Sequence, residues 1–599
     1  LEKNYFACDN ILAGNYTINP VAPTGGANFQ YFADVLNALT NCGINDTTVF
    51  NIVPGTYDTL LQIPVIPGAG PTADVTFQSS TGVAADVILR NNATSSSDNY
   101  VFALEGTDYL KIRNLSIQAM GSDYANCVTL NNGCENILIE GNNISGKDTL
   151  INNDDLNLIY SSPGSIDSNI VIKNNHLQFG STAISLLTDY NSTSNNISVV
   201  GNTISDYYYA GIQISYSSEI VINTNTVISP STSDYSYGVY VADCENVNIR
   251  MNKIYHANYS ALYVSYVTNT SASSGNIINN FLSTGGNGDS YGLYLYESDD
   301  FKIYHNSANS YSSSSSSAYA FYDYYGSGNN VYNNIFANTG NGYAVGLNYT
   351  SDTSDYNNLY ANGSYLAEYN YSDYSDLASY QTASSLDSNS VSSNPVFVNN
   401  TELHTLAFGN NDQGFGIGVL DDIDGDVRNL TTPDMGADEF TPPMQEAGLI
   451  SILSPVGGCD LAMENIEIQI VCNGLDTIDG NLTAFYSIDG GAPVSQAVTT
   501  QILPGDTLDF TFTTQANLAV GATDQYFQID AWISLTGDPI PVNDTLETNV
   551  ASLHNPAPVV VSNATITYGT TATLNATSTD TIQWYADPAL VTLLETGTS

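Results

Sequence analysis

The sequence predicts an all-β protein in which a parallel β-helix is followed by β-sandwich modules. Three observations predict this fold class. A short Asn-bearing string recurs about every 27 residues, apolar and polar residues alternate around each copy, and the spacing of apolar segments changes after residue 442. A repeat of this length with variable insertions is typical of a solenoid.

The repeat is clearest at Ile139-Glu140-Gly141-Asn142-Asn143-Ile144. The copies are rich in Val, Ile, Thr and Tyr, and no amphipathic run of helix length separates them, so strands and bends make up each turn. We expect equivalent strands to stack about 4.8 Å apart with Ile and Leu inside the bore. The fourth-position asparagines would bond one another as a ladder, or act at some turns only as turn formers. They are Asn142, Asn175, Asn202, Asn225, Asn252, Asn280, Asn306 and Asn334.

The coil is expected over residues 61–442, with an N-terminal cap over residues 1–60. The apolar spacing of Phe29–Leu39 predicts an amphipathic helix with Asn28 as its N-cap and Gly43 at its end. A helix at this place would protect the unpaired strand edges and the open bore at the end of a coil.

The C-terminal part contains short strand patterns separated by Gly and Pro turns, such as Ile466–Val471 and Tyr526–Trp532. Residues 445–552 are predicted to form one β-sandwich, and residues 556–599 to begin another. The last segment is too short to complete a sandwich, so the native chain is expected to continue beyond Ser599.

The chain is strongly acidic. Ten Lys and Arg face sixty Asp and Glu, which gives a formal net charge of −50. This balance argues against nucleic acid or an anionic membrane as a partner. All ten basic residues lie at or before Arg428. No apolar run reaches the length of about 18 residues that would span a membrane.

Seven cysteines occur without a CxxC pair or a Cys/His cluster. In an extracellular protein, Cys8 with Cys42 and Cys459 with Cys472 are plausible disulfides, and Cys127 with Cys134 would close one bend. The alternative is that they are buried free thiols. The chain begins at Leu1 rather than Met, as a secreted protein would after signal removal, so we expect an extracellular location.

An aromatic strip is expected on one face of the coil. Alternation places Tyr240, Tyr263 and Tyr294 outward on successive turns, with Tyr237 and Tyr291 beside them. Stacked aromatic side chains stabilise parallel strands in their own right. An equally good interpretation is a platform for sugar rings or for a partner protein.

Basic residues that directly follow inward-facing Ile, or lie near those positions, are the candidates for catalysis. They are Arg113, Lys173, His176, Arg250 and Lys253. Arg113 and Lys173 flank Glu140 at one-turn spacing, which would suit a polysaccharide lyase but is better explained as a surface charge ladder. We therefore assign no catalytic residue from the sequence.

Calcium is the one cofactor that the sequence suggests. Asp422, Asp424 and Asp426 have the odd spacing found at the start of calcium loops, but the later Glu of an EF-hand is missing. A hydrogen-bonded Asp-Gly turn is the other interpretation.

Two strings near the end of the predicted coil carry a resemblance. Asp422-Ile423-Asp424-Gly425-Asp426-Val427-Arg428 and Pro433-Asp434-Met435-Gly436-Ala437-Asp438-Glu439 resemble the closing segment of right-handed parallel β-helix proteins secreted by Bacteroidetes. Gly14–Ile18 and Val53–Tyr57 resemble their opening. The resemblance implies a right-handed coil, immunoglobulin-like modules after it and the type IX secretion machinery as a partner.

The resemblance also implies glycosylation. Asp-Thr followed by Leu, Ile or Thr resembles the O-glycosylation signal of Bacteroidetes, and the modified threonines would lie on loops. The matching positions are Thr47, Thr59, Thr149, Thr477, Thr507, Thr545 and Thr581.

Together these patterns favour a secreted, surface-attached protein that acts as an adhesin or as a structural component of an extracellular layer or filament. Its partners would be carbohydrate, other cell-surface molecules or copies of itself. A polysaccharide lyase or glycoside hydrolase with accessory modules is the alternative, because this fold supports both kinds of role.

Overall fold

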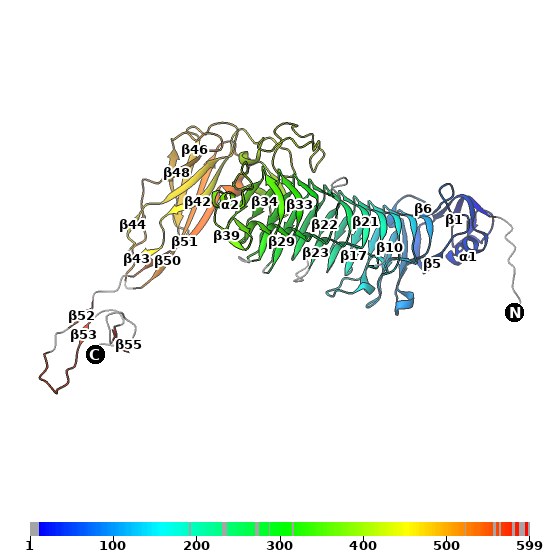
Figure 1. Cartoon of the computed structure of the whole chain (residues 1–599), viewed down its shortest axis with the longest axis horizontal. Helices are drawn as coiled ribbons and strands as arrows, with labels where there is room; N and C mark the ends of the chain where they lie inside the picture. The colour runs from blue at the N-terminus through cyan, green and yellow to red at the C-terminus, as the bar shows by residue number, and fades with distance from the viewer. Residues whose placement is uncertain are drawn as a thin grey trace. The chain divides into compact units, whose positions relative to one another are not determined.

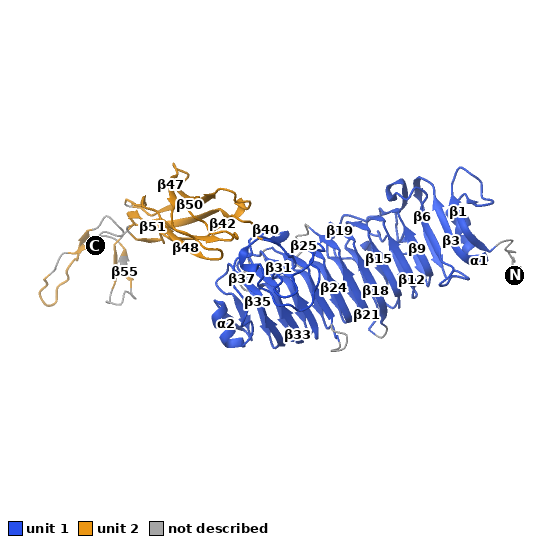
Figure 2. Ribbon diagram, turned by 90° about the horizontal axis from the view of Figure 1, so that it is seen from above, with its two compact units in different colours: residues 1–441 blue, residues 442–599 orange. Residues whose placement is uncertain are grey.

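The computed structural model describes residues 11–190, 193–229, 236–269, 275–286, 288–313, 317–459, 461–521, 523–554, 559–561, 565–577, 582–585 and 593–596. The chain forms two compact units, residues 1–441 and residues 442–599 (Figure 2). In the described residues, no helix is both long and apolar enough to cross a membrane.

The first unit is a parallel β-helix whose turns each contribute one strand to each of three sheets (Figure 1). The first sheet has fourteen described strands, in spatial order β2 (Asn28–Phe29), β1 (Leu12–Ile18), β3 (Ile44–Ile52), β6 (Val75–Ser79), β9 (Asp108–Arg113), β12 (Glu135–Glu140), β15 (Ser168–Lys173), β18 (Ser194–Val200), β21 (Ser217–Asn223), β24 (Glu245–Arg250), β27 (Gly275–Ile278), β30 (Phe301–Tyr304), β33 (Ser327–Tyr332) and β36 (Ser351–Asp355).

The second sheet has twelve described strands, β4 (Gly55–Asp58), β7 (Val87–Asn91), β10 (Ser116–Ala119), β13 (Asn143–Ser145), β16 (His176–Gln178), β19 (Thr203–Ser205), β22 (Thr226–Ile228), β25 (Lys253–Ala257), β28 (Phe281–Thr284), β31 (Ser307–Ser310), β34 (Ile335–Asn338) and β37 (Asn358–Ala361). The third sheet has thirteen, β5 (Leu61–Pro64), β8 (Phe102–Glu105), β11 (Val128–Asn131), β14 (Ile159–Ser161), β17 (Thr182–Leu187), β20 (Ala210–Ser215), β23 (Tyr237–Ala242), β26 (Ser260–Ser265), β29 (Ser290–Tyr296), β32 (Ala318–Tyr324), β35 (Tyr343–Asn348), β38 (Ala367–Tyr369) and β39 (Ser372–Tyr374).

The bore of the coil is filled by aliphatic side chains from equivalent positions. Ile137 pairs in register with Ile170, and Ile170 with Ile197, and all three side chains are buried. Their neighbours on each strand point outward, as the period of two requires. The prediction of a parallel β-helix built from the Asn-bearing segments is therefore confirmed.

The predicted asparagine ladder is confirmed in the bend between the first and second sheets. Asn202 Nδ2 donates to Asn225 Oδ1 at 3.0 Å, and Asn202 Oδ1 accepts from Asn175 Nδ2 at 3.0 Å. Each amide also bonds backbone, as when Asn202 Nδ2 donates to Ile172 O at 2.9 Å. The ladder continues past Asn334 to Asn357, which the sequence pattern did not identify.

The N-terminal end of the coil carries helix α1 (Phe32–Cys42), and Phe32, Val35 and Leu39 join the apolar core of the bore. Gly43 ends the helix as predicted, with a φ of 67° that favours glycine. The prediction of Asn28 as N-cap is wrong, because the helix begins after Tyr31. Asn28 lies in β2, where its amide donates to the carbonyl oxygens of Ala22 and Pro23.

The other end of the coil is covered by a hairpin and a helix. Strand β39 runs antiparallel to β38, which ends the run of parallel pairs. Helix α2 (Leu377–Ser384) packs on this hairpin and buries Tyr380 completely. These elements protect the last strand edge from pairing with another chain.

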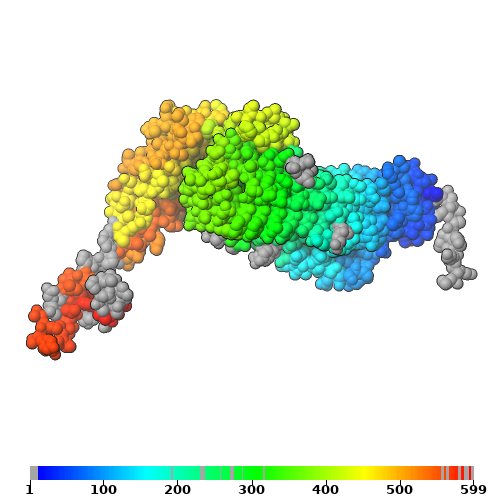
Figure 3. Space-filling view, viewed as in Figure 1, coloured from blue at the N-terminus to red at the C-terminus, as the bar shows by residue number. Residues whose placement is uncertain are grey.

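Residues 385–441, the returning segment, follow α2 and run back along the second sheet (Figure 3). It contains the hairpin β40 (Phe397–Asn399) and β41 (Glu402–Thr405), which contacts β28 and β31. Leu403, Ile423 and Ala437 pack against Tyr255 and Phe281 of the coil. The segment thereby brings the Asp-rich residues near position 424 onto the coil.

The second unit contains two mostly antiparallel sheets that share one apolar core. One sheet is β42 (Ala447–Ser454), β45 (Glu467–Cys472) and β48 (Thr507–Thr511). The other is β43 (Gly458–Cys459), β51 (Thr545–Leu553), β50 (Gln525–Leu535), β46 (Leu482–Ile488) and β47 (Val494–Val498). Three further pairs are β44 (Met463–Glu464) with β49 (Ala516–Asn517), β52 (Val560–Val561) with β53 (Ala576–Thr577), and β54 (Gln583–Tyr585) with β55 (Leu593–Thr596).

Two of the predicted disulfides are wrong. Cys459 and Cys472 are free thiols, with Cys459 exposed on β43 and Cys472 buried on β45. Cys127 and Cys134 are also free, and their sulfurs lie against different carbonyl oxygens, those of Ser145 and Leu104. The predicted Cys8–Cys42 bridge stays a prediction, since Cys8 lies outside the described residues.

Asn202→Ala tests the ladder. In a buried bend, the substitution removes the acceptor of Asn175 Nδ2 and the side-chain donor to Asn225 Oδ1 and to the carbonyl of Ile172. Since each unsatisfied buried group costs about 1–3 kcal/mol, we expect the free energy of unfolding to fall by about 3 kcal/mol. Urea unfolding of the full chain measures it.

Thr203→Ala is the matched control, because Thr203 is the next residue and its side chain is exposed. We expect a change within about 0.5 kcal/mol for this variant. Equal effects of the two substitutions would contradict the structural role assigned to the ladder.

Candidate functional site

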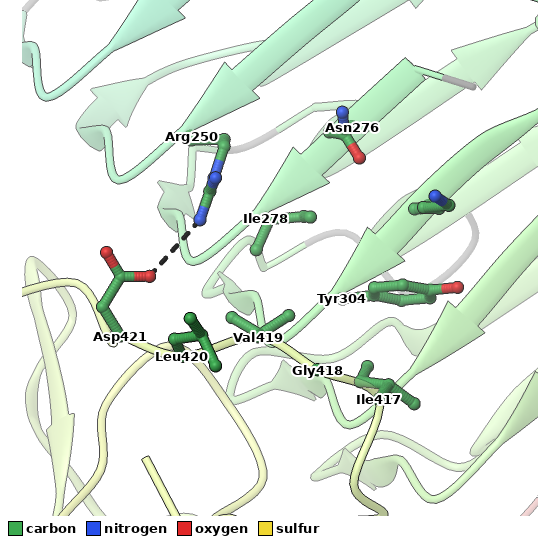
Figure 4. Close-up of a pocket in the computed structure, with 10 residues that line it drawn as sticks. Arg250, Asn276, Ile278, Tyr304, Ile417, Gly418, Val419, Leu420 and Asp421 are labelled. Atoms are coloured by element: carbon green, nitrogen blue, oxygen red, sulfur yellow. Dashed lines mark hydrogen bonds and ion pairs between the residues drawn. The ribbon is translucent and has the colours of Figure 1, made fainter. Parts of the chain in front are cut away.

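A pocket of about 490 Å³ lies between the first sheet and residues 417–421 (Figure 4). Arg250, Ile278 and Tyr304 end three successive strands, β24, β27 and β30, and occupy one column of the sheet. Asn276 and Lys302 form the neighbouring column. The volume falls within the range of about 300–1,000 Å³ that is usual for small-molecule sites.

Arg428 holds the opposite wall of the pocket in place. Its guanidinium is fully buried and donates from Nε to the carbonyl oxygen of Asp421 at 3.2 Å and from Nη2 to Asn279 Oδ1 at 3.1 Å. Asn279 Nδ2 in turn donates to Asp421 O at 2.6 Å. Glu439 compensates the buried charge at 3.2 Å from Nη1. Asp421 and the wall around it are thus fixed to the coil through Asn279, which lies more than a hundred positions earlier in the chain.

Two cations face this pocket in a chain that has few. Arg250 Nη2 lies 3.4 Å from Asp421 Oδ1, the contact drawn in Figure 4. Lys302 is exposed and makes no ion pair with any described residue. The side chains of Arg250, Lys302 and Asp421 together leave one net positive charge, and the hydroxyl of Tyr304 and the amide of Asn276 add polar groups. This arrangement suits the binding of an anionic group with neighbouring hydroxyls.

Arg113, Glu140 and Lys173 form the expected charge ladder on the first sheet. They stand in register on β9, β12 and β15, with Glu140 2.8 Å from Arg113 and 3.1 Å from Lys173. Both cations are therefore engaged with the same carboxylate. His176 is exposed at the start of β16, in the second sheet.

Lys253 lies at the start of β25 and reaches a cluster formed by the segment that turns back. Its ammonium is 2.9 Å from Asp424, whose other oxygen lies 2.5 Å from His404 Nε2. Glu402 contacts the other ring nitrogen of His404. Burial alone would lower the pKa of His404, but the adjacent carboxylates raise it above its usual value.

The three predicted calcium ligands do not converge on one site. Asp422 is buried and accepts the backbone N–H groups of Asp424 and Asp426 at 2.9 and 2.8 Å, which is a hydrogen-bonded Asp-Gly turn. Asp424 instead lies with His404 and Asp438, and ligand atoms of these three are within 4.8 Å of one another. Asp426 is exposed. The structure brings Asp424 alone of the predicted three into that group.

The predicted tyrosine strip stands on the third sheet. Tyr240 and Tyr263 stack at 5.1 Å with their planes 12° apart, and Tyr263 and Tyr294 lie 4.7 Å apart. Tyr237 stacks on Tyr240, and Tyr291 on Tyr294. Stacked rings cover one another's faces, so this column offers less open ring surface to a sugar than isolated tyrosines would.

The described threonines of the predicted glycosylation signals are all at least partly exposed. Thr59, Thr149 and Thr477 lie in loops as expected, whereas the expectation of loops is wrong for Thr47, Thr507 and Thr545, which lie in strands β3, β48 and β51. They occupy outward positions of their strands, because side chains alternate between the two faces. Thr581 is outside the described residues.

Sequence reasoning missed Lys302, Tyr304 and residues 417–421 as parts of one site. Lys302 occupies the same column as Asn276. A complete alignment of the repeats would have placed this column next to the one that contains Arg250. The position of residues 417–421 has no such signal, because nothing in a repeat pattern tells where a returning segment lies. Tyr319 and Tyr322, which extend the tyrosine strip, follow the alternation already seen around Tyr291 and Tyr294.

Comparisons with known proteins add no family to this description. No protein-family model matches the chain, and no curated protein sequence matches it.

Arg428→Met tests the wall of the pocket. The substitution leaves Glu439 without its cation and frees the backbone of Asp421. Loss of one partner of a buried ion pair costs about 3–5 kcal/mol, so we expect marked destabilisation of the coil or early release of the returning segment. Limited proteolysis with mapped cleavage sites measures it, with Arg90→Met, which breaks an exposed ion pair, as the control. Equal cleavage of both variants would contradict the role of Arg428.

His305 predicts a pH dependence. It is buried against Asn333 beneath the returning segment, and burial, followed by the charge of Arg428, holds its pKa well below 6.5. The unfolded imidazole gains a proton below pH 6.5 and the folded one does not, so this stability is present above 6.5 and is lost as the pH falls. Asp434, whose pKa burial raises to about 7, acts in the opposite direction.

His305→Asn separates the two effects, because Asp434 is present in both proteins. Between pH 6.5 and 5 we expect the wild type to lose about 2 kcal/mol relative to this variant, at about 1.4 kcal/mol per pH unit. Unfolding curves at several pH values measure the difference. Parallel pH profiles would contradict a neutral buried His305.

Proposed function

We propose that this chain is an extracellular, surface-attached protein that binds acidic carbohydrate, as an adhesin or as a structural component of an extracellular layer, without cleaving it. The observation that carries the proposal is the pocket in which Arg250 and Lys302, two of the ten basic residues, face one space with Tyr304 and Asn276. A carboxylate or sulfate group on a sugar ring matches this mixture of cations, hydroxyl and amide.

A site for an acidic ligand is unexpected in a chain with a net charge of −50, since the general field repels anions. Local cations must therefore outweigh that field, whose long-range repulsion salt screens more than it screens direct contacts. The column geometry supports a polymer as the ligand, because the first sheet presents equivalent outward positions at each strand spacing along the coil.

Binding without cleavage is supported by the engagement of the other basic side chains. Arg113 and Lys173 share Glu140, and Lys253 contacts Asp424. A general base needs an unpaired group of suitable pKa beside the reacting proton. The alternative, a polysaccharide lyase, is favoured by Lys302, because it is exposed, without a described ion pair, and lies in the same pocket as Arg250 and Tyr304.

The resemblance of the closing segment supports the remainder of the proposal. It implies a right-handed coil, a β-sandwich of immunoglobulin-like type in the second unit, type IX secretion and glycans on the Asp-Thr sites. The two mostly antiparallel sheets around one core are compatible with such a module.

Lys302→Ala tests the proposed function. We expect the full chain to bind oligogalacturonate, oligoguluronate or chondroitin sulfate and not neutral glucose oligomers. The substitution should weaken binding about tenfold or more, since a charge-assisted hydrogen bond contributes about 1.5–3 kcal/mol. Isothermal titration calorimetry on the three acidic ligands measures it.

Lys147→Ala is the matched control, because Lys147 is exposed and forms no ion pair with a described residue, but lies outside the pocket. Binding that is equal in both variants would place the ligand elsewhere. Release of unsaturated sugars, followed by their ultraviolet absorbance, would instead support the lyase, and absence of any binding would refute the proposed function.

A further inference from the structure

One end of the second unit contains acidic side chains whose oxygens are buried without partners. Glu446 lies just before β42 and is fully buried. Asn543 and Asp544 lie in the loop between β50 and β51, and Asp538 lies in the same loop. Asp538 Oδ2 accepts the N–H of Ala447 at 2.9 Å, which brings this loop against the residue that follows Glu446.

Three oxygens of this group have no hydrogen-bond partner among the described residues: Glu446 Oε2, Asn543 Oδ1 and Asp544 Oδ1. The other carboxylate oxygen of Glu446 accepts from Asn543 Nδ2 at 2.6 Å, so Glu446 is held beside the loop. Native proteins satisfy buried polar groups, and three unsatisfied acceptors on Glu446 and the loop that it contacts point to a missing donor or cation.

No Lys or Arg of this unit can fill that role, because residues 429–599 contain neither. Burial raises the pKa of Glu446 and of Asp544 to about 7, and Asp538 adds further repulsion to both. A cation in their midst would remove the repulsion and satisfy the oxygens together.

We propose that Glu446, Asn543 and Asp544 bind a calcium ion through these three oxygens. Hard oxygen donors select Ca²⁺ or Mg²⁺ rather than zinc, and the thiol of the nearby Cys472 lies against the carbonyl oxygens of Gly474 and Asp476. Mg²⁺ retains most of its water, whereas Ca²⁺ accepts irregular sets of six to eight oxygens, so a fully buried carboxylate favours Ca²⁺.

The ion would join the start of the unit to its last long hairpin. Glu446 immediately precedes β42, the first strand, and Asp544 immediately precedes β51. The Ile533 N–H of β50 donates to Asp544 O at 3.0 Å, which fixes the loop to that strand. Calcium would thus fasten the point at which the chain enters the sandwich, independently of the carbohydrate pocket in the first unit.

Terbium and calcium binding to the full chain, after removal of metals with EDTA, test the proposal. Trp532 pairs with Thr545, the residue after Asp544, so it should sensitise Tb³⁺ luminescence that Ca²⁺ then displaces. We expect Ca²⁺ to raise the unfolding temperature of this unit more than the same concentration of Mg²⁺, which controls for screening of the net charge. Glu446→Gln should weaken Ca²⁺ binding at least about tenfold, because ligand charge sets affinity.

Glu467→Gln is the matched control, since Glu467 lies on β45 and bonds Thr511 outside the cluster. Asp544→Asn gives a second test at a partly exposed residue if Glu446→Gln fails to fold. Asp424→Asn reports on the Asp-rich turn of the coil. Unchanged Ca²⁺ affinity in both ligand variants, loss of binding in Asp424→Asn alone, or no calcium effect beyond that of Mg²⁺ would each overturn the proposal.

Discussion

The buried asparagine ladder is the interaction on which the rest of the coil depends. Each bend between the first and second sheets exposes backbone groups that strands cannot satisfy, and one amide per turn bonds them from inside the bend. Because the same amide also bonds its equivalents in the turns before and after it, the ladder fixes both the shape of the bend and the register of the stack. A slip by one residue would move every aliphatic side chain out of the bore.

Because of that register, equivalent residues of successive turns form fixed columns on the surface of the coil. Arg113, Glu140 and Lys173 meet as ion pairs, and Tyr240, Tyr263 and Tyr294 stack, because each set occupies one column at successive turns. Columns alone make a flat surface. The pocket arises where residues 417–421 stand against one such surface, held there by the buried Arg428.

Charge is distributed unevenly between the two units, and the consequences differ. In the coil, most of the described cations are paired with carboxylates, and the returning segment gathers Asp422, Asp434 and Glu439 around Arg428. In the second unit no Lys or Arg exists, so its buried carboxylates have only amides and backbone groups as partners. Buried carboxylates therefore meet a buried cation, Arg428, in the first unit, whereas those of the second unit are left open to protons or cations.

The sequence alone determined the coil, because its period and its Asn positions are local patterns that repeat. It also determined the column of tyrosines and the Arg113–Glu140–Lys173 ladder, since both follow from the same register. It misplaced the N-cap of α1 by three residues, because Asn28 bonds the carbonyls of Ala22 and Pro23 within β2. Only the tertiary structure decided which cysteines are free thiols and which part of the coil residues 400–440 pack against. It alone also showed that Lys302 and Arg250 share a pocket. These features depend on contacts between residues far apart in the chain, which no periodic pattern encodes.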